Sequence, residues 1–126
     1  MQRLTFHPSW DKGLSDDDRE WINHIFQETR ISNQCNIEFT PLWDALNHKG
    51  DLLVTVLVHN TGEKNFFFDN HDLIYSVNNQ TMAEHCFMLP NFIIEPTTSM
   101  PWTFIFPYGT FTTENQSLKD GVLTME

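Results

Sequence analysis

Apolar residues recur at two different periods along this chain, and the change of period separates a helical part from a strand-forming part. In the first part, apolar side chains lie three or four positions apart, which is the spacing of one face of an α-helix. These residues are Trp21, Ile22, Ile25 and Phe26. Ser15 is suited to cap the helix, and the three aspartates after it favour the positive end of the helix dipole. We therefore expect a helix over residues 16–29.

After this helix, apolar residues tend to alternate with polar ones, which is the period of a β-strand. The strongest strand pattern is LLVTVLVHN, residues 52–60, which is apolar on both faces. Such a strand is buried on both sides, which favours a helix packed over one sheet. Turn sequences separate it from three other expected strands. They are CNIEFTPLWDAL (35–46), FFFDNHDLIYSV (66–77) and MAEHCFML (82–89).

The stretch EPTTSMPWTFIFP, residues 95–107, predicts a loop that crosses between sheets and a closing strand. Its polar part, residues 96–99, is too short to link two domains. Pro101 stands where we expect the strand to begin, and Pro107 where it must end. In the tail that follows, GVLTM is expected to add a short edge strand.

Several short strands separated by turns predict an antiparallel sandwich. We expect an α+β fold, an immunoglobulin-like antiparallel β-sandwich with an N-terminal helix. A chain of 126 residues corresponds to a single domain over residues 1–126. Within it, the sandwich is expected over about residues 35–111, and residues 112–126 form the C-terminal tail.

The charge balance limits the partners that the chain can have. Seven Lys and Arg stand against 17 Asp and Glu, a formal net charge of −10. This sign argues against nucleic acids and anionic membrane surfaces, and it favours proteins with basic or apolar faces. The chain has no apolar run long enough to insert into a membrane and no recognisable secretory signal. We therefore expect a cytoplasmic protein.

Four segments resemble a known family when they are taken together and in order. They are FHPSW (6–10), LSDDDREW (14–21), GDLLVTVLVHNTGEK (50–64) and PTTSMPWTFIFP (96–107). They resemble the SLAP-type domain of accessory Sec system S-layer assembly proteins from Bacillus-like, spore-forming bacteria. Those proteins carry the domain as a pair, and this chain resembles a single-copy relative. The resemblance implies an accessory protein that works by contact, with exported surface proteins or their translocase as partners.

The residue types that carry catalysis form no catalytic or metal-binding pattern in the sequence. Neither C-x-x-C nor H-x-x-x-H occurs, and adjacent strand residues such as His85 and Cys86 face opposite ways. No serine lies in a G-x-S-x-G elbow. The acidic surroundings disfavour a reactive thiolate, and a disulfide between Cys35 and Cys86 is left open. We expect no catalytic residues, metal or cofactor, and no enzyme activity.

Large apolar residues offer a candidate interaction surface. Because Phe66, Phe67 and Phe68 are consecutive in a strand, one face receives two of them and the other face receives one. Either the helix or a loop covers the second face, or at least one phenylalanine is exposed for docking. Ile93 raises the same question. Trp102 either plugs the end of the sandwich or belongs to an interface.

These patterns favour a non-enzymatic protein-interaction module, accessory to the export or assembly of surface-layer proteins. Apolar contact would hold the partner and the acidic surface would steer basic partners, although an exposed sheet edge could instead capture an extended segment. Two alternatives are left open. One is a homo-oligomeric structural or regulatory protein of the cytosol, such as a homodimer through the phenylalanine strip. The other is a small-ligand binder or enzyme with a pocket between helix and sheet.

Overall fold

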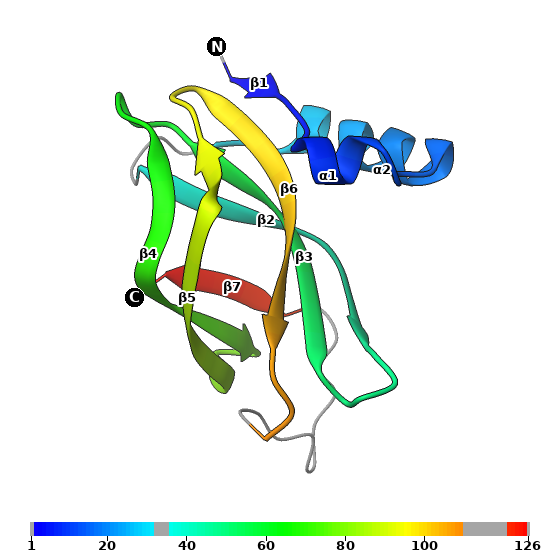
Figure 1. The fold of residues 1–126 in the computed structure, drawn as a ribbon, viewed down its shortest axis with the longest axis vertical. Helices are drawn as coiled ribbons and strands as arrows, with labels where there is room; N and C mark the ends of the chain where they lie inside the picture. The colour runs from blue at the N-terminus through cyan, green and yellow to red at the C-terminus, as the bar shows by residue number, and fades with distance from the viewer. Residues whose placement is uncertain (1, 32–35, 110–120, 126) are drawn as a thin grey trace.

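Two β-sheets pack face to face in the computed structural model, which describes residues 2–31, 36–109 and 121–125 (Figure 1). The first, sheet A, contains in spatial order β1 (Arg3–Leu4), β6 (Thr98–Phe106), β3 (Leu52–Asn60) and β2 (Ile37–Leu46). The second, sheet B, contains β5 (Gln80–Ile94), β4 (Phe66–Val77) and β7 (Val122–Met125). The chain is therefore an α+β, sandwich-like fold, as expected from its strand pattern.

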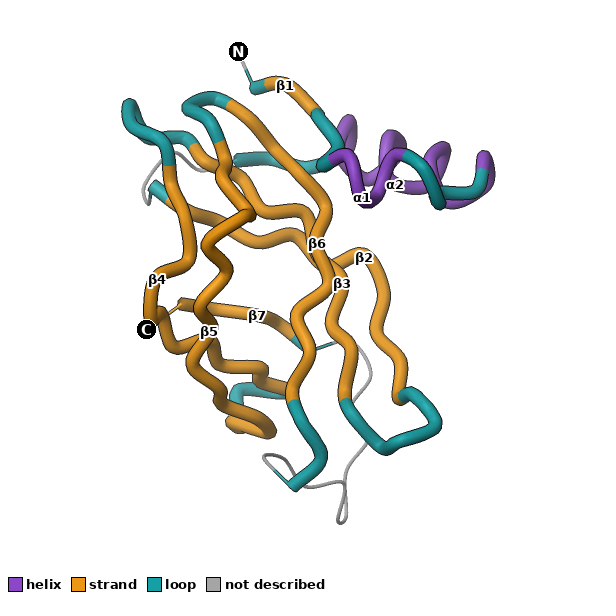
Figure 2. The backbone as a smooth tube through the Cα atoms, in the orientation of Figure 1, coloured by secondary structure: helices purple, strands orange, loops and turns teal. Residues whose placement is uncertain are grey.

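Neighbouring strands pair antiparallel, except that the short β1 runs parallel to β6. The chain passes from sheet A to sheet B between β3 and β4, and it returns between β5 and β6. Figure 2 shows both connections at the same end of the sandwich. The predicted crossing loop before the closing strand is thus confirmed. The predicted short edge strand in the tail is β7, which pairs with β4 at the edge of sheet B.

The helix α2 (Asp16–Glu28) follows a single helical turn, α1 (Pro8–Asp11). The hydroxyl of Ser15 accepts a hydrogen bond from the Asp18 backbone N–H at 3.1 Å, which confirms the predicted N-cap. Ile22 of α2 is fully buried against Leu42 of β2 and Leu57 of β3. The helix therefore covers part of the outer face of sheet A, and β3 is buried on both sides over most of its length, as its sequence predicted.

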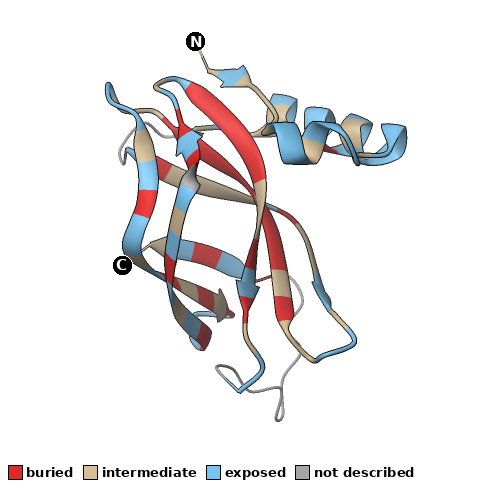
Figure 3. Cartoon of the chain, in the orientation of Figure 1, coloured by how far each residue is buried: buried red, intermediate tan, exposed pale blue. Residues whose placement is uncertain are grey.

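The main core lies between the two sheets and is rich in phenylalanine. Phe68 of β4 packs against Phe104 of β6, with ring centroids 5.2 Å apart, and against Phe92 of β5 at 5.9 Å. Such close aromatic contacts add to the free energy gained from burying their area. In Figure 3 the buried residues concentrate in β3 and β6, whereas β4 and β5 show buried and exposed segments in turn.

The closing strand begins earlier than the sequence predicted. β6 starts at Thr98, so Pro101 lies inside the strand, buried and opposite Leu57 of β3. A proline is tolerated in a strand where it faces an unpaired edge, and β1 pairs only with Thr98 and Ser99. The position of Pro101 is therefore explained by the shortness of β1. The end of the strand at Phe106, just before Pro107, agrees with the prediction.

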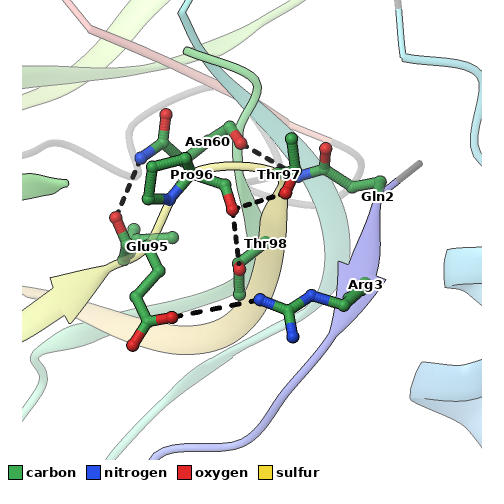
Figure 4. A network of polar contacts seen from close by, with 8 residues as sticks. Gln2, Arg3, Asn60, Glu95, Pro96, Thr97 and Thr98 are labelled. Carbon is green, nitrogen blue, oxygen red and sulfur yellow. Dashed lines mark hydrogen bonds and ion pairs between the residues drawn. The ribbon is translucent and has the colours of Figure 1, made fainter. Parts of the chain in front are cut away.

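Polar contacts bind the N-terminal segment to the turn between β5 and β6 (Figure 4). The Arg3 backbone N–H donates to the Thr97 carbonyl at 2.9 Å, and its guanidinium lies 3.9 Å from the Glu95 carboxylate. The Gln2 side chain donates to the backbone carbonyl of Asn60 at 3.1 Å. Three segments that are distant in sequence therefore meet at this end of the sandwich.

Candidate interaction surface

The outer side of sheet B is not covered by any helix or loop within the described ranges, because both helices lie on sheet A (Figure 1). Phe67 of β4 and Ile93 of β5 are directly opposite each other in the strand register. They are 50% and 49% exposed, respectively. This pair is therefore an exposed apolar patch on the outer side of sheet B.

The same side of the sheet continues from apolar to acidic residues. Met88 of β5, 59% exposed, follows the Phe67–Ile93 pair along the strands. Further along the strands, Asp72 of β4 lies opposite Cys86 of β5. Beyond them, the exposed Glu84 of β5 lies opposite Ile74 of β4. We use the name "open face" for the outward surface of sheet B that these residues define. They are Phe67, Ile93, Met88, Asp72, Cys86, Ile74 and Glu84.

The strand pleat explains why one phenylalanine of three reaches this surface. Successive side chains alternate between the faces of a strand, so Phe66 and Phe68 point inward when Phe67 points outward. Phe68 is fully buried and Phe66 is half-buried. Beyond Phe68 the register shifts, and Asn70 adopts a positive φ of 58°. This irregularity resets the alternation, so that Asp72 faces outward although it lies an odd number of residues from Phe67.

The structure brings together only two of the five residues predicted to form an interaction surface. Phe67 and Ile93 share the open face. Phe68 belongs to the core, and Trp102 stacks on Phe92 with ring centroids 4.1 Å apart. Phe66 lines a separate groove of about 610 Å³ between β2 and β7. The three other residues therefore do not extend the open face.

Sequence reasoning missed Met88, Asp72 and Glu84 as members of this surface. The alternation in EHCFM does place Glu84, Cys86 and Met88 on one side of a strand, so the signal was present. Asp72 lies in the strand FFFDNHDLIYSV, five residues after Phe67, so simple alternation would place it on the opposite face. Its outward orientation depends on the register shift near Asn70, which has no reliable sequence signature.

A comparison with protein families identifies the chain. The family model of the SLAP domain matches residues 4–125. The chain belongs to the SLAP domain family. The match includes the four segments that carried the resemblance in the sequence, and it extends through β7. No curated protein and no solved structure gives a match to this SLAP domain.

A serine and a histidine lie in contact inside the SLAP domain, on the helix-covered side of sheet A. His59 Nδ1 is 2.6 Å from Ser99 Oγ, and its Nε2 is 2.8 Å from Thr40 Oγ1. Both His59 and Ser99 are fully buried, so no substrate can reach the serine hydroxyl. Desolvation lowers the pKa of His59 to about 4, although the charge of Glu38 opposes this shift. The imidazole is therefore neutral and connects three strands of sheet A.

The exposed thiol of the SLAP domain lies on the open face at Cys86. Desolvation is the largest cause that raises the pKa of this thiol. A hydrogen bond to Asp72 and the negative charge of that carboxylate also raise the pKa. A thiol with a raised pKa is protonated at neutral pH and is a poor nucleophile. Cys35, whose pairing with Cys86 the sequence left open, lies outside the described residues.

Two further features bear on the chemistry of the SLAP domain. Among the residues that the structure describes, no three His, Cys, Asp or Glu side chains come together in a way that could hold a metal ion. None of the described helices has the length and apolar character needed to cross a membrane.

Proposed function

We propose that this SLAP domain is a non-enzymatic protein-interaction module of the cytoplasm, accessory to the export or assembly of surface-layer proteins. The family is named for the accessory Sec system, which supports a role beside a protein translocase. The single observation that carries the proposal is the exposed Phe67–Ile93 pair on the open face. Apolar anchors of this kind, placed on a rigid element, are the usual centre of a protein–protein contact.

The charge of sheet B supports a protein partner with basic groups. β4, β5 and β7 contain Asp69, Asp72 and Glu84 but no lysine or arginine. The lysines and arginines of the chain all lie outside these three strands. A surface of one charge sign steers partners of the opposite sign and rejects those of its own sign.

Docking on the open face is better supported than addition of a strand to a sheet edge. Pro41 lies in β2 and Pro90 lies in β5, which are edge strands of sheet A and sheet B. A proline on an edge strand removes a hydrogen-bond donor and hinders the pairing of a further strand. β7 offers only four residues for such pairing.

Self-association through the open face is the weaker alternative. Two copies facing each other would bring Asp72 and Glu84 against either the acidic or the apolar end of a second open face, and neither end contains a lysine or arginine. Like charges placed together in an interface are costly. A homodimer through this face would need basic residues that sheet B does not contain.

A ligand pocket between helix and sheet is also less well supported. Ile22 and Leu57, at the centre of that interface, are both fully buried in contact with apolar neighbours. The hollow beside them, about 360 Å³ and lined by residues such as Trp10 and Trp43, is a shallow depression at the surface. Such a depression lacks the enclosure typical of small-molecule sites.

The proposal is tested by measuring binding of the purified chain to surface-layer precursors and translocase components from its source organism. Phe67→Asp should weaken binding at least about tenfold, because it places a charge at the apolar anchor. Ile105→Asp is the matched control, since Ile105 is 48% exposed but lies on sheet A. Equal binding by both variants and the wild type would refute the proposed surface.

A further inference from the structure

The open face changes from apolar to acidic along the strands, and this order restricts the chemistry of what it can bind. Phe67, Ile93 and Met88 form the apolar end. Asp72 and Glu84 follow along the strands. From Phe67 to Ile74, which lies opposite Glu84, the sheet spans seven residues, or roughly 20 Å at the rise of a β-strand.

The two carboxylates lie close enough to act together on one partner. Asp72 is opposite Cys86, and Glu84 is opposite Ile74, so the two acidic residues are diagonal neighbours across β4 and β5. Diagonal neighbours on one face of an antiparallel pair lie about 7–8 Å apart. No ion pair involves either carboxylate among the described residues. Both carboxylates can therefore form ion pairs with a cationic group of a binding partner.

We infer that the open face recognises an extended segment in which Lys or Arg residues directly adjoin an apolar run. The cationic residues contact Asp72 and Glu84, and the apolar run covers Phe67, Ile93 and Met88. A segment of six or seven residues matches the length of the surface. This inference rests on the proposed function and names the partner class of the same surface.

A secretory signal has this composition in one continuous stretch, because a positively charged region precedes an apolar region. The composition therefore connects the open face to the substrates of an export pathway rather than to the translocase machinery. Uniformly acidic or purely apolar segments fit the surface less well. The first is repelled by Asp72 and Glu84, and the second leaves both carboxylates without a cation.

The test uses a labelled synthetic peptide in which three lysines precede a run of leucine and alanine, with binding to the full chain followed by fluorescence anisotropy. A second peptide replaces the lysines with glutamates, and a third spreads the lysines evenly through the same composition. We expect the first peptide to bind most tightly, with an affinity that falls as salt is added.

Two double variants separate the open face from the overall charge of the chain. D72N with E84Q should lower the affinity for the first peptide by roughly three- to tenfold, the range expected for two exposed ion pairs. D17N with E20Q removes the same charge from exposed positions of α2 and should change the affinity by less than about twofold. Circular dichroism and thermal unfolding show whether all variants remain folded.

The outcomes distinguish failure of this inference from failure of the proposed function. Equal losses in the two double variants, or equal binding of all three peptides, would overturn the inference. The inference is also overturned if wild type binds no peptide but still binds a surface-layer precursor or translocase component through Phe67. In that case the proposed function stands. If neither the peptides nor those proteins bind, both proposals fail.

Discussion

The imidazole Nδ1 of His59 lies 2.6 Å from the Ser99 hydroxyl oxygen, with both side chains fully buried in sheet A. The second ring nitrogen contacts the Thr40 hydroxyl at 2.8 Å. A neutral imidazole has one donor and one acceptor nitrogen, and the two hydroxyls can complement both. Protonation would place a charge in a desolvated site, and this cost explains why the pKa of His59 is lowered to about 4.

We predict that the free energy of unfolding decreases as the pH falls from about 6.5 to about 4. The His59 pKa is about 4 when folded, against an ordinary value of 6.5, so the unfolded chain binds more protons in this window. The stabilisation is fully present above pH 6.5, and its loss amounts to about 3 kcal/mol. Urea unfolding at several pH values should show a smaller decrease for His59→Gln. Parallel curves for the two proteins would contradict the prediction.

The side chain of Asn60 is predicted to be essential for joining the two sheets. It is buried, and its amide donates to the carbonyls of Lys64 and Ile94, each at 2.8 Å. Its carbonyl accepts from the Gly62 N–H at 3.0 Å. Asn60→Asp keeps the shape but cannot donate, so we expect a loss of about 2–4 kcal/mol in the free energy of unfolding. Wild-type stability of this variant in urea would show that these bonds contribute little.

Gly121 is predicted to tolerate no side chain, because Tyr75 of β4 occupies the space beside it. A Cβ built at Gly121 would overlap the Tyr75 ring, whereas one at Gly13 meets no atom within 4 Å. The Gly121 N–H also donates to the Tyr75 hydroxyl at 3.2 Å, just before β7 begins. We expect Gly121→Ala to lower stability by about 1–3 kcal/mol and Gly13→Ala to have little effect. Thermal unfolding of the two variants tests this contrast, and equal stability of Gly121→Ala and Gly13→Ala would contradict it.

Phe67 and Phe68 should respond in opposite ways to truncation, although they are neighbours in sequence. Phe68 is fully buried, so Phe68→Ala should cost about 3–5 kcal/mol of stability. Phe67 is half exposed, and Phe67→Ala should cost less than about 1 kcal/mol. Equilibrium unfolding in urea measures both values. A reversed order would mean that the open face of sheet B has been assigned to the wrong side of β4.

Sequence periodicity was sufficient to predict α2, β3, β4 and the end of the closing strand, since each depends on local alternation, capping or a proline. The two buried faces of β3 also predicted that the helix would cover a sheet. The outward position of Phe67 could not be predicted, because it depends on sheet A, rather than sheet B, receiving α2. That choice is made by contacts such as Ile22 with Leu57, which are distant in sequence.

Irregular strand register also prevented a full prediction of the open face from the sequence. β5 was expected to end at Leu89, but it continues to Ile94 past Pro90 and an irregular register. That extension is what places Ile93 opposite Phe67. The start of β6 at Thr98 likewise depends on pairing with β1 and with the end of β3, which are distant in sequence and which no local pattern reveals. The immunoglobulin-like character of the sandwich stays a prediction.

Cys86 allows the central claim to be measured directly, because its exposed thiol lies on the open face opposite Asp72. A Cys35→Ser variant leaves Cys86 as the single thiol, and its alkylation is followed at mildly alkaline pH because its pKa is raised. If a bound surface-layer precursor or translocase component covers the open face, saturation with that partner should slow the alkylation of Cys86 by about tenfold or more. An unchanged rate at saturation would show that the partner binds elsewhere, and the open face would no longer be the interaction surface.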